Sequence, residues 1–214
     1  WDAKAPELPP LPLIRQLYFV TEAPETDVPA LLEKAPQLER LELHGSHLKG
    51  RTLPDAIGDF ANLHELMINN CGLTKLPDAL GKLPLEELTL VHNSFTALPD
   101  VVCTLTSLKR LIVSEALAKL PDALANLTRL TELRLGGSLN KGESLYDRDE
   151  AKKMKDVPVV LASLTGLEVL SLGRCGVRDG ANFEKLCASL TNLKTLNLEA
   201  AGLTSLEVLA PLKQ

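Results

Sequence analysis

Apolar and polar positions follow two different periods within one segment that recurs along the chain. In residues 120–135, L-P-D-A-L-A-N-L-T-R-L-T-E-L-R-L, the apolar residues of the first half are three apart, a spacing typical of a short helix. At the end of the second half, L-x-x-L-x-L, they alternate strictly, as in a strand with one buried face. Near copies occupy residues 53–68, 76–90, 98–113 and 157–172. The pattern predicts a repeated unit of a strand and a short helix.

The unit cannot bury its apolar side alone, so its copies are expected to stack on one another. The proline behind the first leucine suits the first turn of a short helix. Most successive units are 22 to 26 residues apart, within the range of ~20–29 residues that is typical of leucine-rich repeats. Strands are predicted from the first leucine-like residue of each L-x-x-L-x-L, at Ile14, Leu38, Leu63, Leu85, Leu108, Leu130, Leu167 and Leu193.

The full pattern, L-P-x-x-L-x-x-L-x-x-L-x-L-x-x-N/C-x-L, resembles the intracellular type of leucine-rich repeat, found in bacterial effectors and cytoplasmic scaffolds. The resemblance implies an α/β fold, a right-handed solenoid with about eight parallel strands on its concave face and short helices or turns on its convex face. We treat residues 1–214 as a single repeat domain and expect it to be a fragment of a longer protein. One buried column is predicted to contain Leu41, Leu66, Leu88, Leu111, Leu133 and Leu170.

The chain departs from the family pattern at the asparagine, whose side chain is expected to satisfy backbone groups of the turn that leaves each strand. Only Asn93 matches it. Serine and cysteine can replace the asparagine in part, and alanine cannot. The equivalent residues elsewhere are Ser46, Cys71, Ala116, Ser138, Cys175 and Ala201.

Composition narrows the class of partner. The net charge of −5 argues against a nucleic-acid binder, which needs a basic face. No apolar run reaches the ~18 residues of a membrane helix.

The proline-rich segment 1–12 is either a cover for the first repeat or a broken half repeat.

The four cysteines match no zinc or redox motif. Cys71 and Cys175 are four repeats apart, roughly 20 Å at a strand spacing of ~4.8 Å, and a disulfide needs Cα atoms within ~7 Å. We therefore predict four free thiols, which suit a cytoplasmic location, either the bacterial cytoplasm or a host cytosol into which the protein is delivered.

The longest interval, 37 residues, contains an insertion of about 14 residues within 136–156. Its composition, with Asp149 and Lys153 at i,i+4, predicts a short helix. Loops of this length are often functional, so Leu145, Tyr146 and Met154 are predicted to add apolar contacts beside a concave, largely charged patch that contains Arg110, Ile112, Arg134 and Arg174. The alternative is a tolerated surface loop.

Residues that alternate with the buried leucines form a broad face of mixed charge, which suits a protein partner rather than a small molecule. Exposed apolar residues among charges are typical of interfaces, although isolated ones are also common on ordinary surfaces. We predict partner binding by Tyr18, Glu42, Met67, Thr89, Arg110, Ile112, Arg134, Tyr146 and Arg174.

No metal site, cofactor or catalysis is predicted. His44 and His64 lie in adjacent repeats but about 16 Å apart along the strand direction, too far to share an ion. Common catalytic motifs are missing. The sequence thus predicts a protein-interaction module of unspecified oligomeric state. The alternatives are the substrate-recognition domain of a larger enzyme, such as a bacterial effector with a separate catalytic domain, and a purely structural scaffold.

Overall fold

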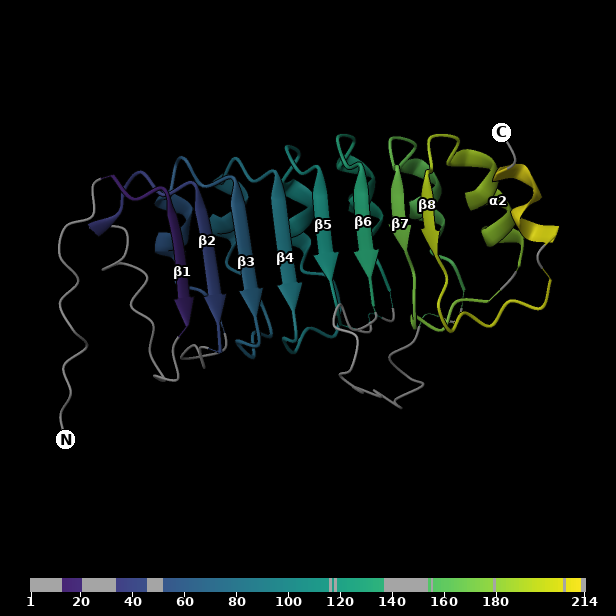
Figure 1. Cartoon of the computed structure of the whole chain (residues 1–214), viewed down its shortest axis with the longest axis horizontal. Coiled ribbons are helices and arrows are strands. Elements are labelled where there is room, and N and C mark those ends of the chain that lie inside the picture. Colours follow the sequence, from purple (N-terminus) through teal and green to yellow (C-terminus); the bar gives the residue numbers. More distant parts are fainter. Residues whose placement is uncertain are drawn as a thin grey trace.

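The described part of the chain contains eight parallel strands side by side in one open, uncurled sheet, in their order along the chain (Figure 1). The computed structural model describes residues 13–20, 34–45, 52–115, 117, 119–136, 154, 156–178, 180–205 and 207–212. The N-terminal segment 1–12, the predicted helix of the insertion and Tyr146 lie outside these residues. The strands are β1 Gln16–Val20, β2 Arg40–His44, β3 Glu65–Asn69, β4 Glu87–Val91, β5 Arg110–Val113, β6 Glu132–Leu135, β7 Val169–Ser171 and β8 Thr195–Asn197.

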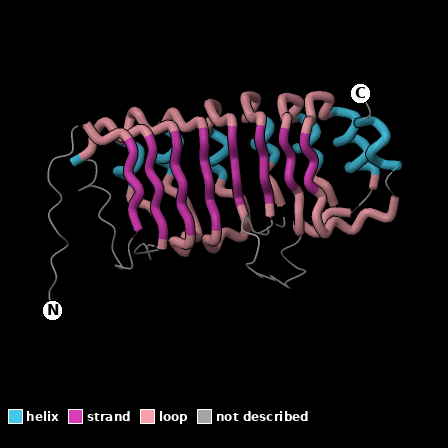
Figure 2. Tube along the Cα trace, in the orientation of Figure 1, coloured by secondary structure: helices cyan, strands magenta, loops and turns pink. Residues whose placement is uncertain are grey.

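Short helices lie behind the sheet between successive strands, and at the C-terminal end α2 and η8 lie beyond β8 (Figures 1 and 2). All but one are 3₁₀ helices in the described part of the chain. These elements are η2 Asp55–Asp59, η3 Asp78–Lys82, η4 Asp100–Thr104, η5 Asp122–Asn126, η7 Val159–Ser163, α2 Ala181–Ser189 and η8 Glu207–Leu212. The predicted solenoid fold is confirmed.

Each strand begins two residues after the leucine-like residue from which the sequence predicts it. From β2 to β8 the reason is a hydrogen-bond pattern that recurs at the strand start. Two consecutive backbone N–H groups donate to one carbonyl of the preceding repeat, as those of His64 and Glu65 do to the carbonyl of Glu39. The first leucine and its neighbour therefore precede the regular ladder, and this leucine is still buried in all repeats between the first and the last.

The predicted leucine column is confirmed in register and in depth. Leu41 pairs with Leu66, and the pairing continues through the successive strands to Leu170. Each of these six side chains is at most 1% exposed. Full burial of one leucine stabilises the fold by about 1.5–3 kcal/mol, so the column supplies much of the stability of the domain.

Proline stands one residue before five of the 3₁₀ helices rather than inside their first turn. In each case its carbonyl accepts the N–H of the residue three positions later, as Pro54 does from Ile57. Its fixed φ fits the extended cap position. The helix before β8 is a nine-residue α-helix, α2, and the interval there is 26 residues rather than 22, which leaves room for the longer element.

The turn after each strand shows how cysteine replaces asparagine. The Asn93 amide donates to the carbonyls of Ile68 (3.0 Å) and Val91 (3.2 Å), and its oxygen accepts the N–H of Leu73 (3.3 Å). The Cys71 thiol lies 3.6 Å from the carbonyl of Leu43, and the Cys175 thiol lies 3.2 Å from that of Leu135. Because these carbonyls occupy equivalent strand positions, the prediction that cysteine serves in part is confirmed.

Asn93→Ala is expected to lower the free energy of unfolding by about 2 kcal/mol, because the carbonyls and the amide that the side chain satisfies lose partners inside the turn. Cys71→Ala is the matched comparison and should cost about 1 kcal/mol, since a thiol is a weak donor. Chemical denaturation measures both. Equal losses for the two variants would contradict the role assigned to the asparagine.

Met154 corrects one prediction from the sequence. It was predicted to offer an apolar contact to a partner, but its side chain is 1% exposed and belongs to the core. Its N–H donates to the carbonyl of Cys175 (2.8 Å). Next to it, Asp156 accepts hydrogen bonds from the N–H of Val157 and from Asn182, both at 2.7 Å. The C-terminal end of the insertion is thus part of the packed structure.

Candidate partner-binding face

The outer face of the sheet, called the strand face below, carries the side chains that alternate with the buried leucines. Parallel pairing places one such residue of each strand directly beside its equivalent in the next. The central column so formed contains most of the predicted partner-binding residues in the expected order. It runs through Tyr18, Glu42, Met67, Thr89, Ile112, Arg134, Ser171 and Asn197.

The members of this column differ in accessibility. Tyr18 on β1 is 61% exposed, while Thr89 on β4 is only 7% exposed and lies between Met67 and Ile112 in the register. Glu42, Met67, Ile112 and Arg134 are half-buried. Thr89 therefore offers little surface to a partner, and Tyr18 offers the most.

Tyr18 forms an aromatic and polar group with the neighbouring strand. Its ring centroid is 4.7 Å from that of His44. Nε2 of His44 is 3.4 Å from Oε2 of Glu42, and the other carboxylate oxygen, Oε1, accepts a hydrogen bond from Nε of Arg40 at 2.8 Å. An exposed aromatic ring beside ordered charges is a common composition for an interface anchor.

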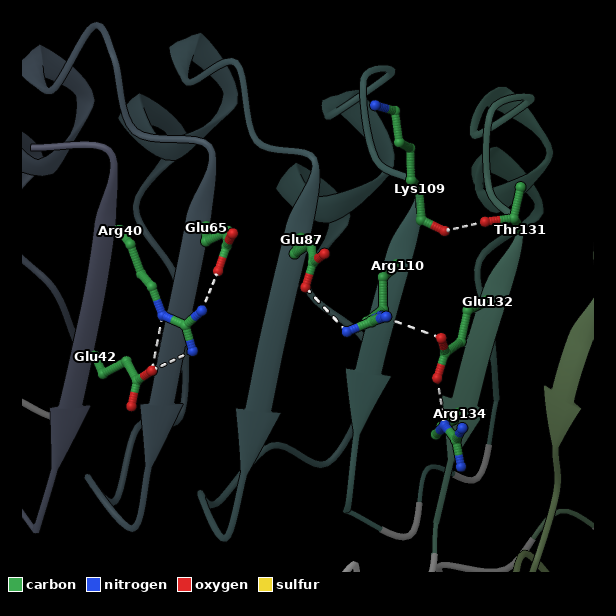
Figure 3. A network of polar contacts seen from close by, with 9 residues as sticks. All are labelled: Arg40, Glu42, Glu65, Glu87, Lys109, Arg110, Thr131, Glu132 and Arg134. Carbon is green, nitrogen blue, oxygen red and sulfur yellow. Dashed lines mark hydrogen bonds and ion pairs between the residues drawn. The ribbon is translucent and has the colours of Figure 1, made fainter. Parts of the chain in front are cut away.

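A second column, one step nearer the strand starts, carries most of the charges (Figure 3). The Arg40 guanidinium contacts Glu65 at 2.7 Å, and that of Arg110 contacts Glu87 at 3.1 Å and Glu132 at 3.0 Å. Arg134 adds a further contact to Glu132 at 2.5 Å. The hydrogen bond that Arg40 donates to Glu42, and after it the negative charge of Glu65, raise the pKa of Arg40 above its ordinary value.

A third set of ion pairs lies at the strand starts. Lys109 contacts Glu86 at 2.7 Å, and this hydrogen bond lowers the pKa of the Glu86 carboxyl. Lys194 contacts Glu168 at 2.9 Å. Exposed pairs of this kind contribute little to stability, because solvent screens them. Their main effect is to hold long side chains in place, which reduces the entropy that binding a partner would cost.

The structure brings three of the four residues of the predicted charged patch together. Arg110 and Ile112 lie on β5, and Arg134 lies beside Ile112 on β6. Arg174 follows β7 in a turn, with a left-handed φ of 61°, and contacts Glu199 at 2.7 Å. From the sequence, the charges of this face were described as mixed and were not paired, although Arg110 stands at the same repeat position as Glu87 and Glu132 on the two adjacent strands.

The sequence also predicts that Glu115 faces outward, but its carboxylate is buried. One carboxylate oxygen accepts the N–H of Asn93 at 2.5 Å, and the other is buried with no hydrogen-bond partner among the described residues. Burial raises the pKa of this carboxyl to about 7. Strand alternation did not apply because β5 ends at Val113, two residues earlier.

No group of three or more His, Cys, Asp or Glu side chains in the described ranges is placed to hold a metal ion. In the same residues, no helix has the length and apolar character needed to cross a membrane. The four cysteines are buried, and none of them forms a disulfide. Burial raises the pKa of Cys103 to about 11 and that of Cys175 to about 12.

A family model described as a leucine-rich repeat region matches residues 14–199 of the chain. The chain belongs to the leucine-rich repeat family. A search of curated proteins found no match for this leucine-rich repeat domain. The family fold generally mediates protein–protein interaction and is typically non-catalytic.

Solved structures share the fold. A leucine-rich repeat protein of Leptospira interrogans matches with a TM-score of 0.72 and 23% identity, over 94% of this chain and 48% of its own. An internalin of Listeria monocytogenes, InlF, matches with a TM-score of 0.59 and 22% identity, over 88% of this chain and 55% of its own. The domain thus spans about half the length of these two proteins.

A third match is the Arabidopsis receptor kinase HAESA, solved in complex with the peptide hormone IDA and the co-receptor SERK1. Its TM-score is 0.58 at 22% identity, over 81% of this chain and 28% of that one. At these identities the likeness shows the fold alone.

Proposed function

We propose that this leucine-rich repeat domain is a protein-recognition module that binds its partner through the strand face. The observation that carries the proposal is the central column, in which the exposed Tyr18 and the half-buried Met67 and Ile112 lie among charged side chains. Apolar anchors surrounded by ordered charges are the usual composition of an interface. The peptide and co-receptor bound by HAESA offer a precedent within the same fold.

Neutral substitutions on the strand face test this function. Tyr18→Ser combined with Ile112→Thr removes apolar surface without changing charge. We expect this variant to capture its partner from a lysate of the source organism roughly tenfold less well, the effect of losing a few interface anchors. The matched control is Val159→Thr, which alters a side chain that is 54% exposed on η7, away from the strands. Equal capture by both variants would overturn the proposal.

The insertion is proposed to extend this interface through Leu145 and Tyr146. Replacing residues 139–153 with a short Gly-Ser linker should change the free energy of unfolding by less than about 1 kcal/mol, because loop closure depends weakly on length. It should also weaken capture of the partner. Replacing 139–156 should instead cost about 2–4 kcal/mol, since it removes the buried Met154. Undiminished capture with the shorter replacement would leave the insertion as a tolerated surface loop.

We propose that the domain acts by binding in the cytoplasm, either bacterial or host. Unpaired thiols suit a reducing compartment. Native protein should react slowly with a thiol reagent, because all four thiols are buried and burial raises the pKa values of Cys103, Cys175 and Cys187. After denaturation without reductant, mass spectrometry should count four labelled cysteines. A smaller number in protein isolated from its source would contradict this location.

A further inference from the structure

The strand face carries opposite charges on its two sides. On β2, β3 and β4, counted together with the residue that precedes each strand, the outward-facing side chains include five glutamates and one arginine. Their net charge is −4 when histidine is counted as neutral. At the same positions of β5 and β6, two arginines and one lysine accompany one glutamate, a net charge of +2. The change of sign falls between β4 and β5, where the Glu87–Arg110 pair joins the two sides (Figure 3).

On the acidic side, Glu65 and Glu87 lie directly opposite each other on adjacent strands. Each carboxylate forms an ion pair on the side away from the other, Glu65 with Arg40 of β2 and Glu87 with Arg110 of β5 (Figure 3). Among the described residues, no cation contacts both carboxylates. Like charges at directly opposed positions are unfavourable in a sheet, so this arrangement is not explained by stability.

The next outward position along the same two strands carries no charge. Met67 follows Glu65 and Thr89 follows Glu87 at the i+2 spacing that keeps residues on one face. Thr89 is nearly covered, and the half-buried Met67 offers apolar surface beside the two carboxylates. A lysine or arginine side chain fits such a place, because its aliphatic stem packs on apolar surface while its charge reaches the carboxylates.

We propose that the strand face binds an extended polypeptide segment that crosses the strands, with basic side chains over Glu65 and Glu87 and acidic side chains over Arg110 and Arg134. The inference rests on the proposed function, to which it adds the chemistry and the direction of the partner segment. Because the charged side chains of the face are already held by ion pairs, little ordering is required of them when the segment binds.

The strand spacing sets the length of the segment. β3 and β6 are three spacings of ~4.8 Å apart, roughly 14 Å, which an extended chain covers in about four residues at ~3.3 Å each. A peptide Lys-Lys-Gly-Ser-Glu-Glu with blocked ends therefore places its two charged blocks over the two sides. The peptide Lys-Glu-Gly-Ser-Lys-Glu has the same composition and net charge but mixes the signs.

The test is a titration of each peptide into the protein at low ionic strength, followed by amide chemical shifts in NMR. Low salt is required because exposed charges are screened beyond ~10 Å at 0.1 M. We expect the ordered peptide to shift amides of β3 to β6 and to bind roughly threefold more tightly than the mixed peptide, a difference in keeping with the strength of exposed ion pairs.

Two double variants test whether Glu65 and Glu87 cause the preference for the ordered peptide. Glu65→Gln with Glu87→Gln should abolish the preference for the ordered peptide. Glu184→Gln with Glu207→Gln changes the net charge equally on exposed positions of α2 and η8 and should preserve it. The inference is overturned if the ordered peptide binds no better than the mixed one, including if neither binds, or if the preference survives the first pair. The capture experiment separates this inference from the proposed function. If the peptide test fails but Tyr18→Ser with Ile112→Thr still impairs partner capture, the assigned charge order is wrong and the proposed function stands.

Discussion

Leu111→Asp is expected to unfold the domain or to lower its free energy of unfolding by more than about 4 kcal/mol. Leu111 is 0% exposed and packs in register between Leu88 and Leu133. An aspartate there would leave a charge without a partner inside the leucine column, which is among the costliest single changes a core can undergo. Each repeat stacks only on its neighbours, so the damage at a central strand also separates the repeats on either side.

The control is the same substitution one residue further along the strand. The Ile112 side chain projects from the strand face beside Arg134, where an aspartate remains hydrated and meets a guanidinium. Ile112→Asp should therefore change the free energy of unfolding by less than about 1 kcal/mol. Circular dichroism during urea denaturation compares the two variants. Similar stabilities would show that the strand does not bury alternate residues as described.

Glu115→Gln is expected to stabilise the domain at pH 8 by up to about 3 kcal/mol. Burial raises the pKa of Glu115 from 4.5 to about 7, so the folded state holds this proton more tightly than the unfolded state does. The stability linked to the protonated carboxyl is fully present below about pH 4.5 and is lost as the pH rises through about 7. Above pH 7 the folded protein must contain a buried carboxylate, whereas glutamine is uncharged at every pH.

The measurement compares the free energies of unfolding of the variant and the parent protein at several pH values between 4.5 and 8. Their difference removes the contributions of all other titrating groups. It should grow with pH across this window for Glu115→Gln and remain nearly constant for the control Glu184→Gln, which alters an exposed carboxyl on α2. A pH-independent difference for Glu115→Gln would mean that this carboxyl titrates normally.

The sheet could be predicted from the sequence because leucines recur at the same positions of every repeat. Any shift of register by one residue would turn a whole column toward solvent, so positions such as Leu66 and Leu88 fix the pairing of their strands. The offset of two residues at each strand start could not be read from the apolar pattern. It depends on two N–H groups that share one backbone carbonyl, and side chains carry no sign of that arrangement.

The burial of Met154 and of Glu115 could not be predicted from the alternation of apolar and polar residues. Met154 stands in a charged stretch of helical composition, and only its contact with the next repeat explains its burial. Glu115 follows the end of β5, beyond the region in which alternation determines the direction of a side chain. In contrast, the ion pairs of the strand face were accessible to sequence reasoning. Arg110 stands at the same repeat position as Glu87 and Glu132, so aligned repeats already place opposite charges side by side.

Site-specific photo-crosslinking tests most directly whether the strand face binds a protein partner. A photoreactive amino acid would replace Ile112 on the strand face in one protein and Val159 on η7 in another. Both proteins would be irradiated in a lysate of the source organism, and the products would be identified by mass spectrometry. We expect one covalent protein adduct that forms at position 112, disappears in the Tyr18→Ser background and is absent at position 159. Adducts that form at position 159 and not at position 112 would contradict it.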